Sequence, residues 1–159
     1  MNLLLDTNVI IDYLGRKQPF FEDAKRIVAM GYFGDARLWA SAQSFKDAFY
    51  VLSHFVDSQK VQHALVRLSE IVNLADLLGD DVLKAAKLGW DDMEDCLIAI
   101  CAEKTGADYL ITRDQKGFSR SPVPAFSPSS LLEKLREEEC VLYGTVKFAS
   151  EEPNPSLPG

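Results

Sequence analysis

The chain has 159 residues, of which 47% are hydrophobic, a proportion that supports one folded domain and excludes a disordered chain. No apolar run approaches the roughly 20 residues that cross a bilayer, so we expect no membrane segment. The formal net charge of −7 argues against a non-specific nucleic-acid binder with a basic face. That argument weakens where acids converge on a metal, so the positions of the carboxylates are more informative than their number.

The N-terminal apolar run lacks a basic region and a cleavage site, and Asp6 interrupts it, so it does not resemble a signal peptide. The three cysteines are an odd number without the paired spacing of a zinc site or a disulfide framework. We therefore expect reduced thiols and a cytoplasmic protein.

Apolar segments and turn signals predict strands that alternate with helices along the chain. We expect strands at about 2–6, 37–40, 71–73, 108–112 and 123–126. We expect helices from about residue 8, at 20–31, 41–56, 57–71, 80–89 and 91–105, and from 127–130 to 139. This alternation predicts a three-layer α/β/α fold with a central, mostly parallel sheet of four or five strands. The expected domain is 1–139, and 140–159 is an extension that we expect to be partly disordered.

Two carboxylates are expected at the edge of this sheet where ligands bind. Right-handed crossovers place the C-terminal ends of parallel strands together at that edge. Asp6 ends the first strand, and Asp114 follows the strand DYLIT by two residues. They would lie close together if these two strands are neighbours. Each also has a simpler explanation, Asp6 as a helix cap and Asp114 as a turn residue.

Asp95 lies in the segment DDMEDCLIAICAEK, whose helical wheel is apolar on more than one side. Such a helix is largely buried, and a buried carboxylate is costly unless it is paired or binds a metal. Asp91 and Asp92 lie one turn earlier on the same face, where they could add outer ligands. Acids in a first turn also complement the helix dipole, which explains Asp91 and Asp92 better than Asp95.

Asp47 belongs to the segment SAQSFKDAFYVL, a predicted helix that buries Phe45, Ala48, Phe49 and Leu52. Asp47 projects away from that apolar face, so periodicity alone favours a solvated position. A position in a cleft is compatible with the same geometry.

Three blocks of the sequence resemble the PIN domain, a family of metal-dependent nucleases, over roughly residues 1–135. The opening strand and DTN motif of the family resemble LLLDTNVIIDYL, and its second acidic segment resembles SAQSFKDAFYVL. Its third and fourth motifs resemble DMEDCLIAICAEKTGADYLITRDQKGF. The chain is most similar to the compact bacterial type, which includes VapC-type toxins of toxin–antitoxin systems. The four acidic positions of the family then fall on Asp6, Asp47, Asp95 and Asp114, although the family more often has Glu at the position of Asp47.

The resemblance implies an endoribonuclease that uses one or two Mg²⁺ or Mn²⁺ ions to hydrolyse phosphodiester bonds in RNA. Four clustered carboxylates repel one another, and a hard divalent cation relieves that repulsion. The inner ligands would be Asp6, Asp95 and Asp114, with Asp47 completing the set and Asp92 as an outer ligand.

Further residues and partners follow from the same resemblance. Carboxylate rotamers would be fixed by Thr7, Asn8 and Thr112. Contacts to RNA would come from Arg113 and Lys116. Toxins of this kind are typically homodimers bound to an antitoxin protein, and a basic antitoxin segment would suit the acidic surface of this chain.

Two other interpretations remain open from the sequence. The chain could be a catalytically idle PIN-like module that binds RNA or a protein, because the fold alone does not determine activity. It could also be a phosphatase or receiver-like domain with an acidic metal pocket. The segment Asp6-Thr7-Asn8 lacks the second acid of the DxD spacing that such a site needs, so we rank this interpretation low.

Overall fold

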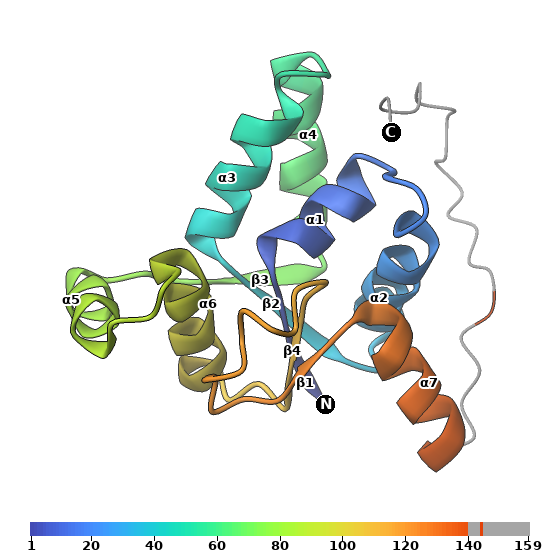
Figure 1. Ribbon diagram of the computed structural model, residues 1–159. Helices are drawn as coiled ribbons and strands as arrows, with labels where there is room; N and C mark the ends of the chain where they lie inside the picture. The colour runs from blue at the N-terminus through green and yellow to red at the C-terminus, as the bar shows by residue number, and fades with distance from the viewer. Residues whose placement is uncertain (140–143, 145–159) are drawn as a thin grey trace.

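The computed structural model describes residues 1–139 and Gly144 (Figure 1). The strands in this part of the chain are β1 (Asn2–Leu5), β2 (Arg37–Ser41), β3 (Val72–Ala75), β4 (Tyr109–Ile111) and β5 (Ala125–Phe126). The helices are α1 (Thr7–Leu14), α2 (Phe21–Phe33), α3 (Ala42–Leu52), α4 (Ser58–Leu68), α5 (Gly79–Leu88), α6 (Met93–Lys104) and α7 (Pro128–Glu139). This alternation agrees with the predicted α/β class.

The five strands form one parallel sheet in the order β3-β2-β1-β4-β5. The chain first builds outward from β1 through β2 to β3. It then returns to pair β4 with the other side of β1 and adds β5. Strand order therefore reverses between β1 and β4, and such a switch point is where parallel sheets form their ligand sites. These two strands are neighbours, which is the condition under which Asp6 and Asp114 were expected to lie close together.

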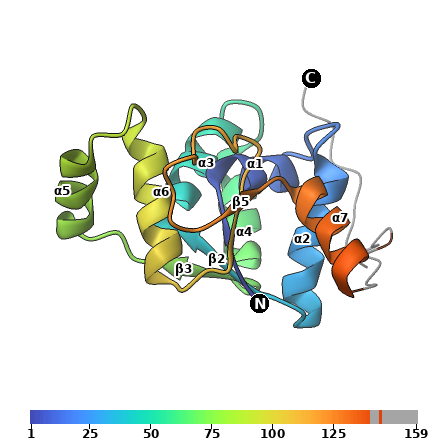
Figure 2. The ribbon, with the colours of Figure 1, turned by 60° about the horizontal axis from the view of Figure 1, so that its bottom comes forward.

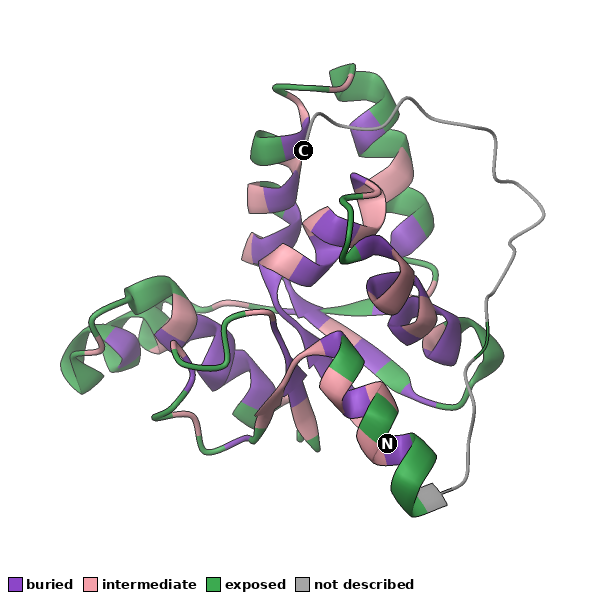
Figure 3. Cartoon of the chain, turned by 45° about the vertical axis from the view of Figure 1, so that its right-hand side comes forward, coloured by how far each residue is buried: buried purple, intermediate pink, exposed green. Residues whose placement is uncertain are grey.

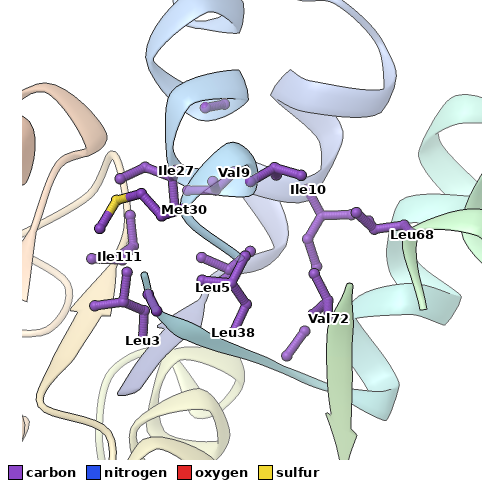
Figure 4. Close-up of a cluster of buried hydrophobic side chains, with 14 of the residues drawn as sticks. Leu3, Leu5, Val9, Ile10, Ile27, Met30, Leu38, Leu68, Val72 and Ile111 are labelled. Carbon is purple, nitrogen blue, oxygen red and sulfur yellow. The ribbon is translucent and has the colours of Figure 1, made fainter. Parts of the chain in front are cut away.

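Helices cover both faces of the sheet, as Figure 2 shows with α5 and α6 on one side and α2 and α7 on the other. Alternate leucines of β1 divide between the two layers. Leu4 packs in a cluster with Ile98 and Ala102 of α6. Leu3 and Leu5 belong to the larger cluster on the opposite face. Figure 4 shows ten members of that cluster by label: Leu3, Leu5, Val9, Ile10, Ile27, Met30, Leu38, Leu68, Val72 and Ile111.

The periphery of the fold is less buried than the sheet, as the colours in Figure 3 show. Ala85 is the buried residue of α5, and this helix is also attached to α6 by an ion pair of 3.1 Å between Lys84 and Glu103. Among the described residues, no helix combines the length and the apolar character needed to cross a membrane.

Helix ends account for most differences between the expected and observed element bounds. The helix expected over 91–105 begins at Met93, because Asp92 is its N-cap. The last strand is shorter than expected and begins after Pro124, which has no N–H for the ladder. The predicted extension 140–159 lies outside the described residues, apart from Gly144.

Candidate active site

Asp6 lies directly after β1, at the strand-order switch point. It has extended backbone angles, φ −70° and ψ 156°, and is the N-cap of α1. Its Oδ1 accepts a hydrogen bond of 2.6 Å from the backbone N–H of Thr7. The sequence predicts this helix from about Asn8, which favours Thr7 or Asn8 as its cap and Asp6 as a metal ligand. In the structure Asp6 itself caps α1, because the strand ends at Leu5 and the first helical residue is Thr7.

The three polar residues predicted to support the carboxylates surround Asp6. The Thr112 hydroxyl donates to Asp6 Oδ2 at 2.7 Å, and the Asn8 amide donates to the same oxygen. Thr112 Oγ1 also accepts bonds of 3.1 Å from Asn8 Nδ2 and 3.0 Å from the backbone N–H of Asp114. The Thr7 hydroxyl donates to Ser44 Oγ at 2.9 Å and so connects α1 to α3. The Asp6 carboxylate is thus held in place by fixed donors.

Burial makes the Asp6 charge costly. The side chain is 5% exposed, and burial raises its pKa from 3.8 to about 6, while the hydrogen bonds from Thr112 and Thr7 act in the opposite direction. The negative charge of Glu94 raises the pKa further. A cation at this position would remove that penalty.

Asp95 and Asp114 complete a group of three carboxylates with Asp6. Asp95 lies in the first turn of α6, and its pKa is raised to about 6 by burial and by the negative charges of Asp92, Asp6, Asp114 and Glu94. Asp114 lies in the loop after β4, where its Oδ1 accepts a bond of 3.1 Å from the Gly117 N–H. The charges of Asp6 and Asp114 act on Asp95, so acids that follow β1 and β4 lie near an acid of α6. Their part as metal ligands stays a prediction.

The absence of a side chain at Gly117 allows two of these carboxylates to approach its backbone closely. A Cβ atom at this position would lie 2.4 Å from Asp95 Oδ2 and 3.1 Å from Asp114 Oδ2. Even the smallest side chain would therefore collide with Asp95. Both carboxylates therefore lie against the Gly117 backbone, where a side chain would displace them.

Asp47 lies in a neighbouring group rather than with these three acids. Its Oδ1 pairs with Lys46 Nζ at 2.7 Å, and it lines a small pocket with Glu94 between α3 and α6. Burial raises the pKa of Glu94, and the charges of Asp47 and Asp92 raise it further. The sequence analysis missed Glu94, although it directly precedes Asp95. The sequence indicates Glu94 only as an acid in the first turn of α6. A helical wheel does not show that this part of α6 lies against α3.

Asp92 is accounted for by its helix. Its Oδ1 accepts bonds of 2.8 Å from Glu94 N and 3.3 Å from Asp95 N, which is the pattern of an N-cap. Its predicted part as an outer ligand has no support from these contacts. The negative charge of Asp92 does affect the site, because it raises the pKa of Asp95.

The cations expected to bind RNA differ in their surroundings. The Arg113 Nε atom lies 2.7 Å from Asp12 Oδ2, and its guanidinium lies 4.4 Å from the ring centroid of Phe20. Lys116 is exposed in the loop after Asp114. The Arg113 side chain is thus engaged by residues of its own chain, whereas Lys116 faces solvent.

The donor set fits a hard divalent cation in its chemistry, because all its members are carboxylate oxygens and two of them have raised pKa values. As the side chains stand, no three Asp, Glu, His or Cys residues in the described part of the chain converge to enclose an ion. Asp6 is fixed by three hydrogen bonds. Closure around an ion would therefore require movement of Asp95 and Asp114, both of which lie against Gly117.

The chain matches a known protein family. A family model described as the PIN domain matches residues 2–116, a segment that contains Asp6, Asp47, Asp95 and Asp114. The chain belongs to the PIN domain family. The resemblance found in the sequence is thereby confirmed.

Solved structures of PIN domains share the fold of this chain. VapBC-1 of nontypeable Haemophilus influenzae is 23% identical, with a TM-score of 0.61 over 81% of this chain and 99% of that one. VapBC2 of Rickettsia felis, solved with a promoter DNA fragment, is 17% identical, with a TM-score of 0.61 over 80% and 98%. VapC20 of Mycobacterium tuberculosis, described as a toxin that cleaves the sarcin-ricin loop, is 16% identical, with a TM-score of 0.59 over 76% and 95%. No curated protein matches the chain.

Proposed function

We propose that this PIN domain is a metal-dependent endoribonuclease and the toxin of a toxin–antitoxin pair. The observation that carries the proposal is the meeting of Asp6, Asp95 and Asp114 at the switch point between β1 and β4, with raised pKa values for the first two. Raised pKa values on acids at such an edge are typical of functional sites.

The chain's own residues would divide the work at this site. A bound Mg²⁺ or Mn²⁺ supplies Lewis acidity toward water and the scissile phosphate. Asp6 would hold the ion in a fixed position, because its hydrogen bonds prevent it from turning. Asp95 and Asp114 would close on the ion from the other two elements.

Asp47 and Glu94 would face the same site from the direction of α3. Asp47 is the fourth acid of the resemblance, and it must leave Lys46 before it can approach a metal or orient water. Glu94 already influences the charge on Asp6 and Asp95. We therefore add Glu94 to the proposed site, as a carboxylate that can take the part expected of Asp47.

Cleavage of a structured RNA in saturating Mn²⁺ tests the proposal. We expect wild type to cleave the RNA and Asp95→Asn to lose cleavage, because the variant keeps the shape of the side chain and removes its charge. Asp35→Asn is the matched control, since Asp35 is exposed before β2, at the opposite edge of the sheet. Equal rates for wild type and Asp95→Asn would remove the basis of the enzyme assignment.

A second candidate function is an idle PIN-like module that binds RNA or protein. It is favoured by the side chains as they stand, since no three acids in the described residues enclose an ion. In the same assay this function predicts no cleavage by wild type. It also predicts that wild type and Asp95→Asn bind RNA with equal affinity.

A toxin would have an antitoxin partner, and we propose a homodimer held by such a partner. Support comes from two of the similar solved structures, the VapBC complexes of Haemophilus influenzae and Rickettsia felis. The net charge of −7 suits a basic antitoxin segment. Cys96 and Cys101 are buried free thiols, in keeping with the proposed cytoplasmic location.

Co-expression with the product of a small adjacent gene tests the partner. We expect a complex of defined stoichiometry in size-exclusion chromatography with light scattering, and inhibition of RNA cleavage within it. A cleaving chain that forms no complex with that product would retain the enzyme and reject the toxin assignment.

A further inference from the structure

In the sequence, Arg113 lies between two residues of the site, but its side chain contacts other parts of the fold. Thr112, before it, donates to Asp6, and Asp114, after it, is one of the three acids. Its guanidinium is held between the Asp12 carboxylate of α1, at 2.7 Å, and the Phe20 ring, at 4.4 Å. Arg113 is therefore engaged with the protein in a way that its predicted contact with RNA does not explain.

The same short segment is attached to α1 at two separate places. The Arg113 backbone N–H donates to Asn8 Oδ1 at 3.2 Å, near the start of α1. The Arg113 side chain pairs with Asp12, one helical turn further along. Because one attachment uses the backbone and the other the side chain, the segment is constrained in both position and direction.

The attachment to Asp12 is one that the fold requires. Asp12 is 1% exposed, and neither of its carboxylate oxygens has a hydrogen-bond partner of good geometry among the described residues, so its contact with Arg113 is a pairing of charges. Burial raises the pKa of Asp12, and the positive charges of Arg113, in direct contact, and of Lys17 act in the opposite direction. Separation of the two groups would expose the charge of Asp12 to an apolar surrounding.

We propose that Arg113 is a positioning residue, whose ion pair with Asp12 fixes the segment that carries Asp114 and so sets the place of that carboxylate relative to Asp6. The local bonds extend this effect, since Asp114 N donates to Thr112 and Gly117 N donates to Asp114. The proposal rests on the proposed function for its chemical meaning, because it concerns the approach of Asp114 to a metal held by Asp6. Arg113 then acts on the site without touching RNA.

Two single variants and one double variant separate positioning from RNA contact. Arg113→Gln and Asp12→Asn each remove one partner of the ion pair. The double variant Asp12→Asn/Arg113→Gln removes both charges, so that no buried charge remains uncompensated if a single variant fails to fold. Lys84→Gln is the control, because it breaks an exposed ion pair with Glu103.

Amide hydrogen exchange of residues 112–118, measured on the full chain without metal, gives the first readout. We expect faster exchange at Asp114 and Gly117 in both single variants and in the double variant, and wild-type exchange in Lys84→Gln. Exchange that remains as in wild type in the folded double variant would overturn the proposal. This readout does not depend on whether the protein is a nuclease.

Mn²⁺ affinity without RNA gives the second readout. We expect Arg113→Gln and Asp12→Asn to weaken Mn²⁺ binding by a similar factor of about ten or more, as losses of contacts that orient a ligand do, with little further loss in the double variant. An RNA contact would instead leave Mn²⁺ affinity unchanged and raise KM for RNA in Arg113→Gln alone, and that result would also overturn the proposal. A wild type that binds no Mn²⁺ would refute the proposed function, while hydrogen exchange would still decide the role of Arg113.

Discussion

The two sides of the site differ in how firmly they hold their acids. On the β1–β4 side, Asp6 is buried and receives three hydrogen bonds from neighbouring groups. On the α3–α6 side, Asp47 is half-buried and pairs with the exposed Lys46. Asp6 is therefore fixed in place before any ligand binds, whereas Asp47 can change its partner. A fixed ligand with adjustable partners would suit the proposed binding of an ion and of RNA.

The largest expected effect comes from adding a side chain at Gly117, where Asp95 and Asp114 lie close to the backbone. In Gly117→Ala the new methyl group would lie 2.4 Å from Asp95 Oδ2, so Asp95 or the loop must move. We expect Mn²⁺ affinity to fall beyond the roughly 100-fold that loss of a supporting contact can cost. Calorimetric titration measures the affinity. Gly79→Ala is the matched control, because a Cβ atom there has no neighbour within 4 Å, and an equal loss in both variants would disprove the steric account.

The second prediction uses pH to test the charge on the anchored side. The pKa of Asp6 is raised from 3.8 to about 6, so the folded state binds this proton more tightly than the unfolded state. The stabilisation of the folded state by this proton is fully present below about pH 4 and is lost as the pH rises through about 6. For a buried acid such as Asp6 the shift corresponds to about 3 kcal/mol in the free energy of unfolding.

Asp95→Asn makes this effect measurable by difference. The pKa of Asp95 is also raised to about 6, and no described residue donates a hydrogen bond to its side chain, so the variant loses a repulsive charge and no bond. Without metal, the stability of Asp95→Asn relative to wild type should increase between about pH 4 and pH 7, by less than the value for Asp6, since Asp95 is partly exposed. Thermal melts across this range measure it, with Asp35→Asn as the control. A difference that is independent of pH would contradict the raised pKa.

The third prediction removes the hydroxyl that connects Asp6 to the Asp114 loop. Thr112→Val keeps the shape of the buried side chain but loses its bonds to Asp6, Asn8 and Asp114. We expect a loss of about 1–3 kcal/mol in the free energy of unfolding, because buried partners remain unsatisfied. Urea denaturation measures this loss. Thr105→Val is the comparison, since the Thr105 hydroxyl bonds only to carbonyls at the end of its own helix. A larger loss in Thr105→Val than in Thr112→Val would contradict the stabilising role given to the Thr112 hydrogen bonds.

The smallest expected effect comes from releasing Asp47, on the α3–α6 side of the site, from its ion pair. Lys46→Gln breaks an exposed ion pair with Asp47, so the thermal midpoint should scarcely change. Mn²⁺ affinity should rise modestly, because Asp47 becomes free to turn toward the site. Lys84→Gln, which breaks another exposed pair, should leave the affinity unchanged. A fall in Mn²⁺ affinity in Lys46→Gln would show that the two sides do not differ in the proposed way.

The arrangement of the sheet explains which parts of the site were predictable. Asp6 and Asp114 follow parallel strands, and the ends of such strands lie at one edge whatever the details of packing. Asp95 was predictable because an acid on a helix that is apolar on several sides needs a reason to be there. Asp47 was assigned by family resemblance alone, and its pairing with Lys46 depends on a rotamer that no sequence period encodes.

Contacts between distant segments were not predictable in the same way. The ion pair of Asp12 with Arg113 joins residues about 100 positions apart, and each alone resembles an ordinary charged residue at the end of a helix or strand. Glu94 was missed because its role depends on how α6 lies against α3 rather than on its own position in the helix. Such contacts arise from the packing of complete elements, which hydrophobic periodicity does not specify.

Calorimetric titration of Mn²⁺ into wild type and Asp95→Asn tests the central claim most directly. If the acids from β1, β4 and α6 form one metal site, wild type should bind Mn²⁺ at a defined stoichiometry and Asp95→Asn should lose that binding. Equal binding by the two proteins, or none by wild type, would contradict the account.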